Sequence, residues 1–115
     1  MFAINFYSQI YVDMLRKGRK TGTVRLGDKS SKYQPGQLVW ITTGHRHGTR
    51  QKLFTAIIDT VRVAPITDLT PREIEKESPE IRTADELVDL LERIYGDSLT
   101  PSNIVTVIQF SQVIE

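Results

Sequence analysis

The sequence predicts a small α+β domain in which helices flank a curved, mostly antiparallel sheet or barrel. Two observations lead to this prediction. Stretches rich in β-branched and aromatic residues alternate with turn signals along the 115 residues, and two of them predict a hairpin. Two later segments begin with explicit helix start signals and continue with leucine and isoleucine at helical spacing.

The chain begins with a predicted strand, helix and second strand. Residues 2–6 form a short apolar run, and Ser8 offers an N-cap for the helix that follows. That helix is expected to end at Gly18, because glycine favours the position just after a helix. Residues 21–26 are rich in β-branched side chains and predict a strand.

The middle of the chain predicts a β-hairpin. Pro35-Gly36 is a strong turn signal, and residues 37–43 after it read as a strand. A glycine-bounded turn at residues 44–48 then leads into a long returning strand over residues 52–63. Trp40 lies among apolar neighbours in the first of these strands, and we expect it in the core.

The last part of the chain predicts two helices and a closing strand. Thr70–Glu73 has the pattern of a capping box with proline at the first helical position. Thr83–Glu86 is a second capping box, and its helix is expected to stop at Gly96. Residues 104–110 then form an apolar strand.

Composition excludes several classes of protein. The length favours a single domain over residues 1–115. The absence of cysteine excludes disulfides, thiol catalysis and cysteine-bound metals. The sequence has neither an apolar run long enough to span a membrane nor an N-terminal signal peptide, so we expect no membrane partner and a cytoplasmic location.

The net charge of +1 conceals an asymmetry between the two halves. Residues 1–64 carry eleven lysines and arginines against three aspartates, whereas residues 65–115 carry four against eleven acids. The two halves can simply attract each other within one domain. Alternatively, a basic face binds a polyanion and an acidic face points away.

The segment Gly18–Arg25 concentrates the functional signal. Five cations lie between residues 16 and 25 with no acid among them. Such a segment can hold phosphate, or it can supply a hydroxyl nucleophile and a lysine whose pKa is lowered by its neighbours. It can equally be a solvated basic edge of a strand. No phosphate-loop glycine pattern is present.

Strand geometry adds a condition to the catalytic interpretation. In a regular strand Thr23 and Arg25 share one face, and Lys20 has the wrong parity to join them. Lys20 can approach Thr23 only if the turn after Gly18 persists through Lys20, or if a bulge near Gly22 redirects the chain.

This segment and others further along the chain also carry a family resemblance. The matching segments are Gly18-Arg19-Lys20-Thr21-x-Thr23-Val24-Arg25, Tyr33-x-Pro35-Gly36-x-Leu38-Val39, Asp59–Val63 with Leu69-Thr70, and Val105-x-Val107-Ile108-x-Phe110. Together they resemble the ASCH domain family over nearly the whole chain. The resemblance implies a PUA-like β-barrel with a cleft beside the first motif, in which RNA or a modified nucleoside is bound.

A small bacterial branch of that family hydrolyses acetylcytidine, and its catalytic residue types recur here. The resemblance implies Thr23 as nucleophile, Lys20 as its base and Glu77 as the acid/base that carries the proton. Without the resemblance, Glu73 and Glu77 are equivalent candidates, because they lie one helical turn apart.

Three functions therefore remain open beside that of a structural or protein-binding domain: an RNA- or nucleoside-binding domain, an acetylcytidine amidohydrolase, and a ribonuclease acting on single-stranded RNA. None of them requires a cofactor. In the binding hypothesis, aromatic residues stack a base and cations hold phosphate. The candidates are Tyr7 and Tyr33 for stacking, and Arg19, Arg25, Arg46, Arg50 and Lys52 for the anion.

A metal site is not expected. His45-Arg46-His47 places two histidines at alternate positions, but the chain has no other histidine and no cysteine. The flanking glycines indicate a hairpin tip instead of a ligand set.

Overall fold

The computed structural model describes residues 1–45 and 48–114. Its elements, in chain order, are β1 (Ala3–Phe6), α1 (Gln9–Arg16), β2 (Gly22–Leu26), β3 (Leu38–Thr43), β4 (Gln51–Pro65), the 3₁₀ turn η1 (Ile66–Asp68), α2 (Pro71–Glu77), α3 (Ala84–Tyr95) and β5 (Ile104–Gln112). Within the described ranges, no helix is long and apolar enough to cross a membrane.

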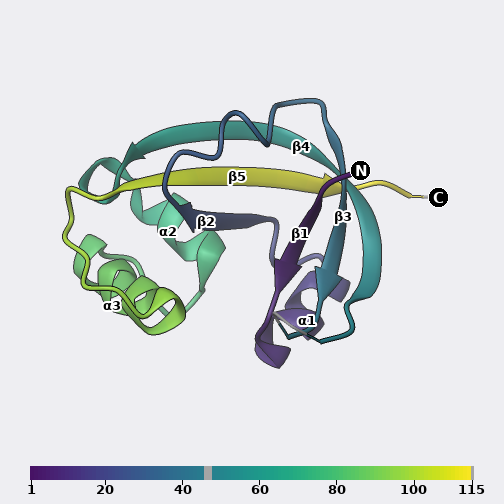
Figure 1. Cartoon of the computed structure of the whole chain (residues 1–115), viewed down its shortest axis with the longest axis horizontal. Coiled ribbons are helices and arrows are strands. Elements are labelled where there is room, and N and C mark those ends of the chain that lie inside the picture. Colours follow the sequence, from purple (N-terminus) through teal and green to yellow (C-terminus); the bar gives the residue numbers. More distant parts are fainter. Residues whose placement is uncertain (46–47, 115) are drawn as a thin grey trace.

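The five strands form one curled sheet in the order β1-β3-β4-β5-β2 (Figure 1). β1 and β3 pair in parallel, and the other three pairings are antiparallel. The predicted α+β class is therefore confirmed, with the sheet shaped as a half-barrel whose edge strands are β1 and β2. The hairpin expected in the middle of the chain is the β3–β4 pair.

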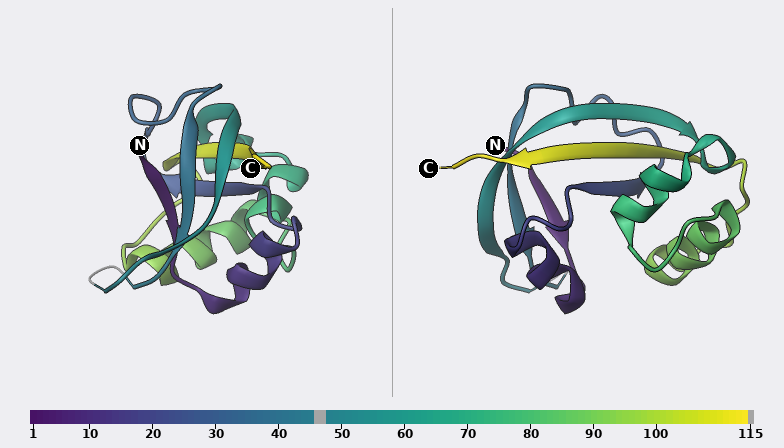
Figure 2. Two further views of the ribbon diagram at one scale, coloured as in Figure 1. Left: turned by 90° about the vertical axis from the view of Figure 1, so that its right-hand side faces the viewer. Right: turned by 180° about the vertical axis from the view of Figure 1, so that it is seen from behind.

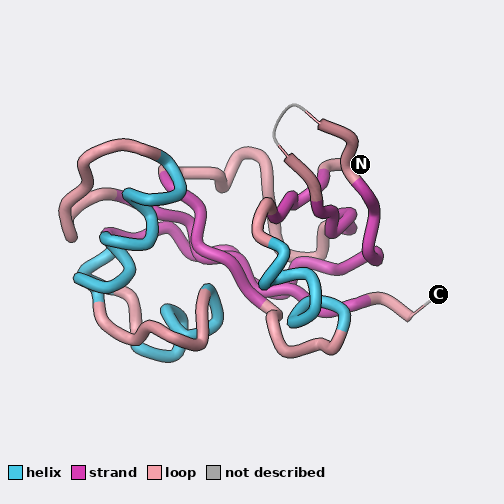
Figure 3. Tube along the Cα trace, turned by 90° about the horizontal axis from the view of Figure 1, so that it is seen from below, coloured by secondary structure: helices cyan, strands magenta, loops and turns pink. Residues whose placement is uncertain are grey.

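The long strand β4 links the two ends of the molecule. It pairs with β3 along its first part and with β5 along its second, and its curvature is visible from behind (Figure 2). A register shift between Ile58 and Thr60 leaves Asp59 as an extra residue, which is the feature that bends a strand. The helices occupy opposite ends: α2 and α3 lie at one end of β4 and α1 at the other (Figure 3).

Two apolar clusters form the core, one at each end. The first holds α2 and α3 against β5, through residues such as Ile74, Leu87 and Val105. The second packs β1, α1 and β3 together around residues such as Leu15 and Ile41. The edge strand β2 contributes to the first cluster and the edge strand β1 to the second. We call the space between these two strands the seam.

The helix ends follow the sequence signals closely. Both capping boxes form, at Thr70 with Glu73 and at Thr83 with Glu86. α1 ends in a Schellman turn, in which Gly18 with φ of 71° lets the Arg19 N–H donate to the Met14 carbonyl.

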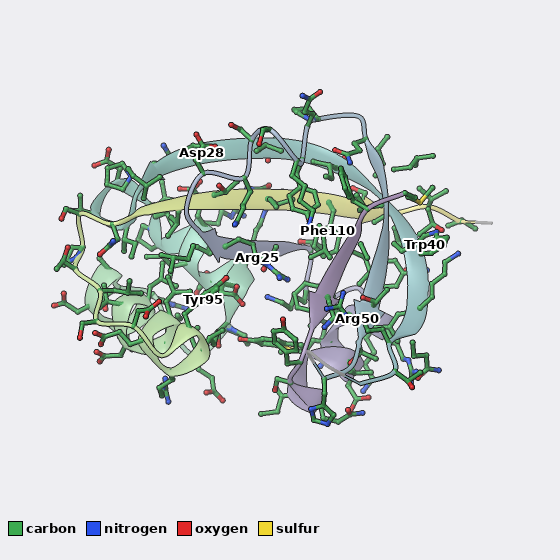
Figure 4. All side chains as sticks on the ribbon, viewed as in Figure 1. Arg25, Asp28, Trp40, Arg50, Tyr95 and Phe110 are labelled. Atoms are coloured by element: carbon green, nitrogen blue, oxygen red, sulfur yellow. The ribbon has the colours of Figure 1, made fainter. Side chains whose placement is uncertain are left out.

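The expectation for Trp40 was wrong. Its side chain is 43% exposed, on the outer face of β3 (Figure 4). The reason is parity: the neighbouring residues Val39 and Ile41 are fully buried, so the residue between them points the other way. The Lys52 ammonium lies 5.6 Å from the centre of the Trp40 ring.

Candidate functional site

The seam between β1 and β2 contains a cavity of about 440 Å³. This volume falls within the range of about 300–1,000 Å³ that is usual for small-molecule sites. The lining comes from both edge strands, the loops beside them, α1, and the ends of α2 and α3. The described lining residues are Asn5, Phe6, Tyr7, Ser8, Tyr11, Thr23, Val24, Arg25, Lys29, Lys32, Tyr33, Glu77, Ile94 and Tyr95.

Lys20 is buried behind this lining. Its side-chain nitrogen donates to the Glu77 carboxylate Oε2 at 2.9 Å and to the carbonyls of Glu77 and Lys76 at 2.5 Å and 3.2 Å. These three acceptors match the three N–H donors of an ammonium group. Two of them are the last carbonyls of α2, where the helix dipole also favours a cation.

The surroundings of Lys20 act on its pKa in opposite directions. Burial lowers the pKa of Lys20, and the Glu77 carboxylate raises it again in part. The amine also lies 4.4 Å from the centre of the Tyr11 ring and 5.4 Å from that of Phe6, which are cation–π distances. Lys20 therefore sits in an enclosed, low-dielectric environment with one carboxylate as its counter-ion.

Glu77 is the centre of the arrangement. One carboxylate oxygen, Oε2, accepts from Lys20, and the other, Oε1, accepts from the Thr23 hydroxyl at 3.2 Å and the Val24 N–H at 3.0 Å. Glu77 is the last residue of α2 and is only 4% exposed. Both oxygens are thus held by the strand β2 and the turn that precedes it.

A close approach of α2 to β2 makes this contact possible. Gly22 lies against the helix: a Cβ there would be 3.2 Å from the Lys76 Cβ and 3.2 Å from the Ile108 carbonyl. Both distances are tighter than ordinary contacts, so the absence of a side chain lets the end of α2 rest on β2.

The other candidate carboxylate, Glu73, is used elsewhere. It accepts from the Thr70 N–H at 2.9 Å as part of the capping box and from Arg62 at 3.0 Å. The geometry therefore separates two glutamates that spacing alone leaves equivalent.

Thr23 and Arg25 lie side by side on the cavity face of β2, as strand parity predicts. The Arg25 Nε donates to the Thr23 hydroxyl oxygen at 3.1 Å. A terminal nitrogen of Arg25 donates across the seam to the Asn5 carbonyl at 3.0 Å. Arg25 therefore bridges the two edge strands and keeps a guanidinium beside the hydroxyl.

The parity condition on Lys20 is met by the first of the two predicted routes. The Met14 carbonyl accepts from the N–H groups of both Arg19 and Lys20, so the turn after α1 persists through Lys20. β2 begins only at Gly22. Lys20 and Thr23 then meet through Glu77, which contacts both, instead of through a direct bond of their own.

The two tyrosines predicted to stack a base both line the cavity, but they differ in solvent exposure. Tyr7 is 44% exposed at the rim. Tyr33 is buried, and its hydroxyl donates to the Ala3 carbonyl at 2.9 Å. Tyr7 is thus the more adaptable of the two.

Of the remaining predicted cations, the three that the structure describes do not line the cavity. Arg19, Arg50 and Lys52 are all exposed, and Lys52 lies on the outer face near Trp40. Arg46 lies outside the described residues, as does His47 of the histidine pair. Among the residues that the structure describes, no group of three or more metal-ligating side chains comes together.

Several lining residues were missed by sequence reasoning. Tyr11 sits beside Glu77, and burial and that carboxylate raise the pKa of its hydroxyl. The hydroxyl of Tyr95, the last residue of α3, accepts a hydrogen bond from the Leu26 N–H. Lys29 and Lys32, in the β2–β3 loop, are the other cations at the cavity. No signal in the sequence singled out Tyr11, and none placed the loop lysines beside the seam.

Chemically, the cavity combines a hydroxyl, a buried carboxylate and a lysine in a connected chain. A nucleophile bonded to a base that is itself oriented by a third group is the general arrangement of covalent hydrolytic catalysis. The same contacts also form a buried ion pair that ties the α1–β2 turn to the end of α2.

Comparison with known structures defines the fold. Protein EF3133 from Enterococcus faecalis V583, of the family DUF984, is 17% identical with a TM-score of 0.71, and covers 98% of this chain and 80% of its own. An ASCH domain from Lactobacillus crispatus JV V101 is 14% identical with a TM-score of 0.69, over 96% of this chain and 77% of its own. This chain has an ASCH-like fold.

A third structure is similar over nearly the whole of both chains. The hypothetical protein PH0355 has a TM-score of 0.68 at 16% identity and covers 97% of this chain and 98% of its own. No protein-family model and no curated protein sequence matches this chain. The ASCH-like assignment therefore rests on structural likeness, which concerns the fold.

Proposed function

We propose that this protein is a nucleoside amidohydrolase that removes the acyl group of an acetylcytidine-type substrate bound in the seam cavity. One observation carries the proposal: the Thr23 hydroxyl donates to Glu77, and Lys20 holds the opposite oxygen of that carboxylate. The hydroxyl and the carboxylate both line a cavity of suitable volume.

The contacts favour Glu77 as the group that takes the proton. Glu77 Oε1 accepts the Thr23 O–H directly, whereas the Lys20 amine donates to Glu77 and Lys76. In this scheme Lys20 is a positioning residue that fixes the carboxylate. This differs from the role that the family resemblance implies, in which lysine is the base.

The reaction then proceeds in two balanced steps. The Thr23 oxygen attacks the acyl carbon while its proton passes to Glu77, and the C–N bond breaks as Glu77 returns that proton to the exocyclic nitrogen. A water molecule then attacks the threonine ester while Glu77 takes one of its protons. Glu77 passes that proton to the leaving Thr23 oxygen as the carboxylic acid is released. The Arg25 guanidinium, bonded to the Thr23 oxygen, is placed to stabilise the negative charge of both tetrahedral intermediates.

The second candidate is binding without chemistry. Rings of Phe6, Tyr7 and Tyr95 line the same cavity as Arg25 and two lysines. Aromatic rings with nearby cations are the usual means of holding an unpaired base and its phosphate. An RNA-binding domain with this cavity therefore remains the alternative, and a ribonuclease would use the same groups on a ribose phosphate.

The test is to incubate the protein with acetylcytidine and, separately, with short single-stranded RNA, and to analyse the products. We expect cytidine and acetate from the first and no cleavage of the second. Thr23→Val should reduce the rate by at least about 100-fold, whereas Thr23→Ser should retain part of it because the hydroxyl remains. Cytidine release that is unchanged in Thr23→Val would refute the proposal, and salt-sensitive RNA binding without any product would favour the binding function.

A further inference from the structure

The cavity lining carries two lysines that the proposed chemistry does not use. Lys29 and Lys32 line the cavity together with Arg25, which that chemistry does use. Among the described lining residues the only acid is Glu77, and its charge is matched by Lys20. A neutral nucleoside has no anionic group to balance the charge of these two lysines, so their presence favours a ligand that carries one.

The two lysines stand on a loop that is fixed in place. The buried Thr106 hydroxyl accepts the Lys29 N–H at 2.8 Å and donates to the Gly27 carbonyl at 2.7 Å. The Lys29 carbonyl in turn accepts from the N–H groups of Lys32 and Tyr33. The loop therefore presents Lys29 and Lys32 from a rigid backbone, which lowers the entropic cost of holding a ligand.

Neighbouring groups leave both ammonium groups available. Asp28, the adjacent acid, accepts from the N–H and the hydroxyl of Ser30 and does not line the cavity. The Lys32 ammonium lies 5.2 Å from the centre of the Phe2 ring and 5.3 Å from that of Tyr33. Those rings orient the Lys32 ammonium without cancelling its charge.

We propose that Lys29 and Lys32 form a phosphate subsite, so that the ligand of the cavity is a nucleotide bearing a terminal phosphate instead of a bare nucleoside. The inference rests on the proposed function, because it assumes that a nucleoside occupies the cavity. A terminal phosphate carries close to two negative charges and strong acceptor oxygens, which two lysines match well. Its source is either a free nucleoside monophosphate or the phosphorylated end of an RNA.

Binding of reaction products tests this directly, because cytidine and its phosphates are not turned over. Calorimetry would compare cytidine, its 5′- and 3′-monophosphates, and cytidine tetranucleotides with and without a 5′-phosphate. We expect one monophosphate to bind roughly tenfold more tightly than cytidine at low salt, and Lys29→Gln/Lys32→Gln to abolish that difference while cytidine affinity stays the same. The control, Arg16→Gln/Lys17→Gln, removes two exposed charges away from the cavity and should keep the preference.

The outcomes separate the two proposals. Equal binding of cytidine and both monophosphates, or a preference that survives in the Lys29→Gln/Lys32→Gln variant, would overturn the phosphate subsite and leave the amidohydrolase proposal intact. Failure of every probe to bind would overturn the phosphate subsite, whereas the amidohydrolase proposal is decided by the acetylcytidine assay. Tighter binding of the 5′-phosphorylated tetranucleotide than of the monophosphate would support the subsite and identify an RNA end as its source.

Discussion

Replacing Glu77 with glutamine removes the one negative charge that compensates Lys20. Three donors converge on the Glu77 carboxylate, from Lys20, Thr23 and Val24. Glutamine offers one acceptor oxygen and turns an NH₂ group toward the remaining donors. The Lys20 ammonium, 3% exposed, then lies in the interior without a counter-ion.

Removing one partner of a buried ion pair costs about 3–5 kcal/mol, which is a large share of the 5–15 kcal/mol that stabilises a typical domain. For a chain of this size such a loss lowers the melting temperature by about 10–20 °C. Urea unfolding followed by circular dichroism measures it. Glu75→Gln is the matched control, because Glu75 lies on the same helix with its side chain 36% exposed and pairs with Arg82. That control should cost less than about 1 kcal/mol.

A double-mutant cycle with Lys20→Met isolates the pair. We expect the Lys20→Met/Glu77→Gln protein to be more stable than the sum of the two single losses predicts, because neither buried charge is left alone. If Glu77→Gln falls within about 1 kcal/mol of the wild type, or if the two substitutions are additive, the buried ion pair described above is wrong.

Two further predictions follow from the same site. Burial and Glu77 raise the pKa of Tyr11 above its ordinary 10.0, so the unfolded chain releases this proton first and stability should decline above about pH 10. Tyr11→Phe should flatten that decline in urea titrations at alkaline pH, and parallel curves for the two proteins would contradict it. Gly22→Ala places a Cβ 3.2 Å from Lys76 and from Ile108, and should cost about 1–3 kcal/mol in unfolding free energy and slow acetylcytidine hydrolysis. Gly48→Ala, where the nearest contact is 3.5 Å, should change neither, and equal effects of the two substitutions would contradict the close approach of α2 to β2.

Local signals in the sequence predicted the elements that depend on local chemistry. The capping boxes at Thr70 and Thr83 located the starts of α2 and α3, and Gly18 located the end of α1. The β3–β4 hairpin also follows from its turn. The parallel pairing of β1 with β3 joins segments that are far apart in the chain, and no local pattern specifies it.

In the candidate site too, local sequence patterns predicted some features, whereas others depend on long-range packing. Strand parity placed Thr23 and Arg25 on one face, and the condition that it set for Lys20 led to the irregular turn before β2. The choice of Glu77 depends on the packing of α2 against Gly22, which helical spacing does not encode. The basic segment also divides in space: Lys20 turns inward and Arg25 lines the cavity, whereas Arg16, Lys17 and Arg19 face solvent.

The most direct test of the central claim, that the Thr23 hydroxyl is the reacting group, is to trap the enzyme during turnover of acetylcytidine. Rapid acid quenching followed by peptide mass spectrometry should find one acetyl group on the peptide that contains Thr23, and none in the Thr23→Val protein. Cytidine release without any acetylated peptide, and at the same rate in Thr23→Val, would contradict the account.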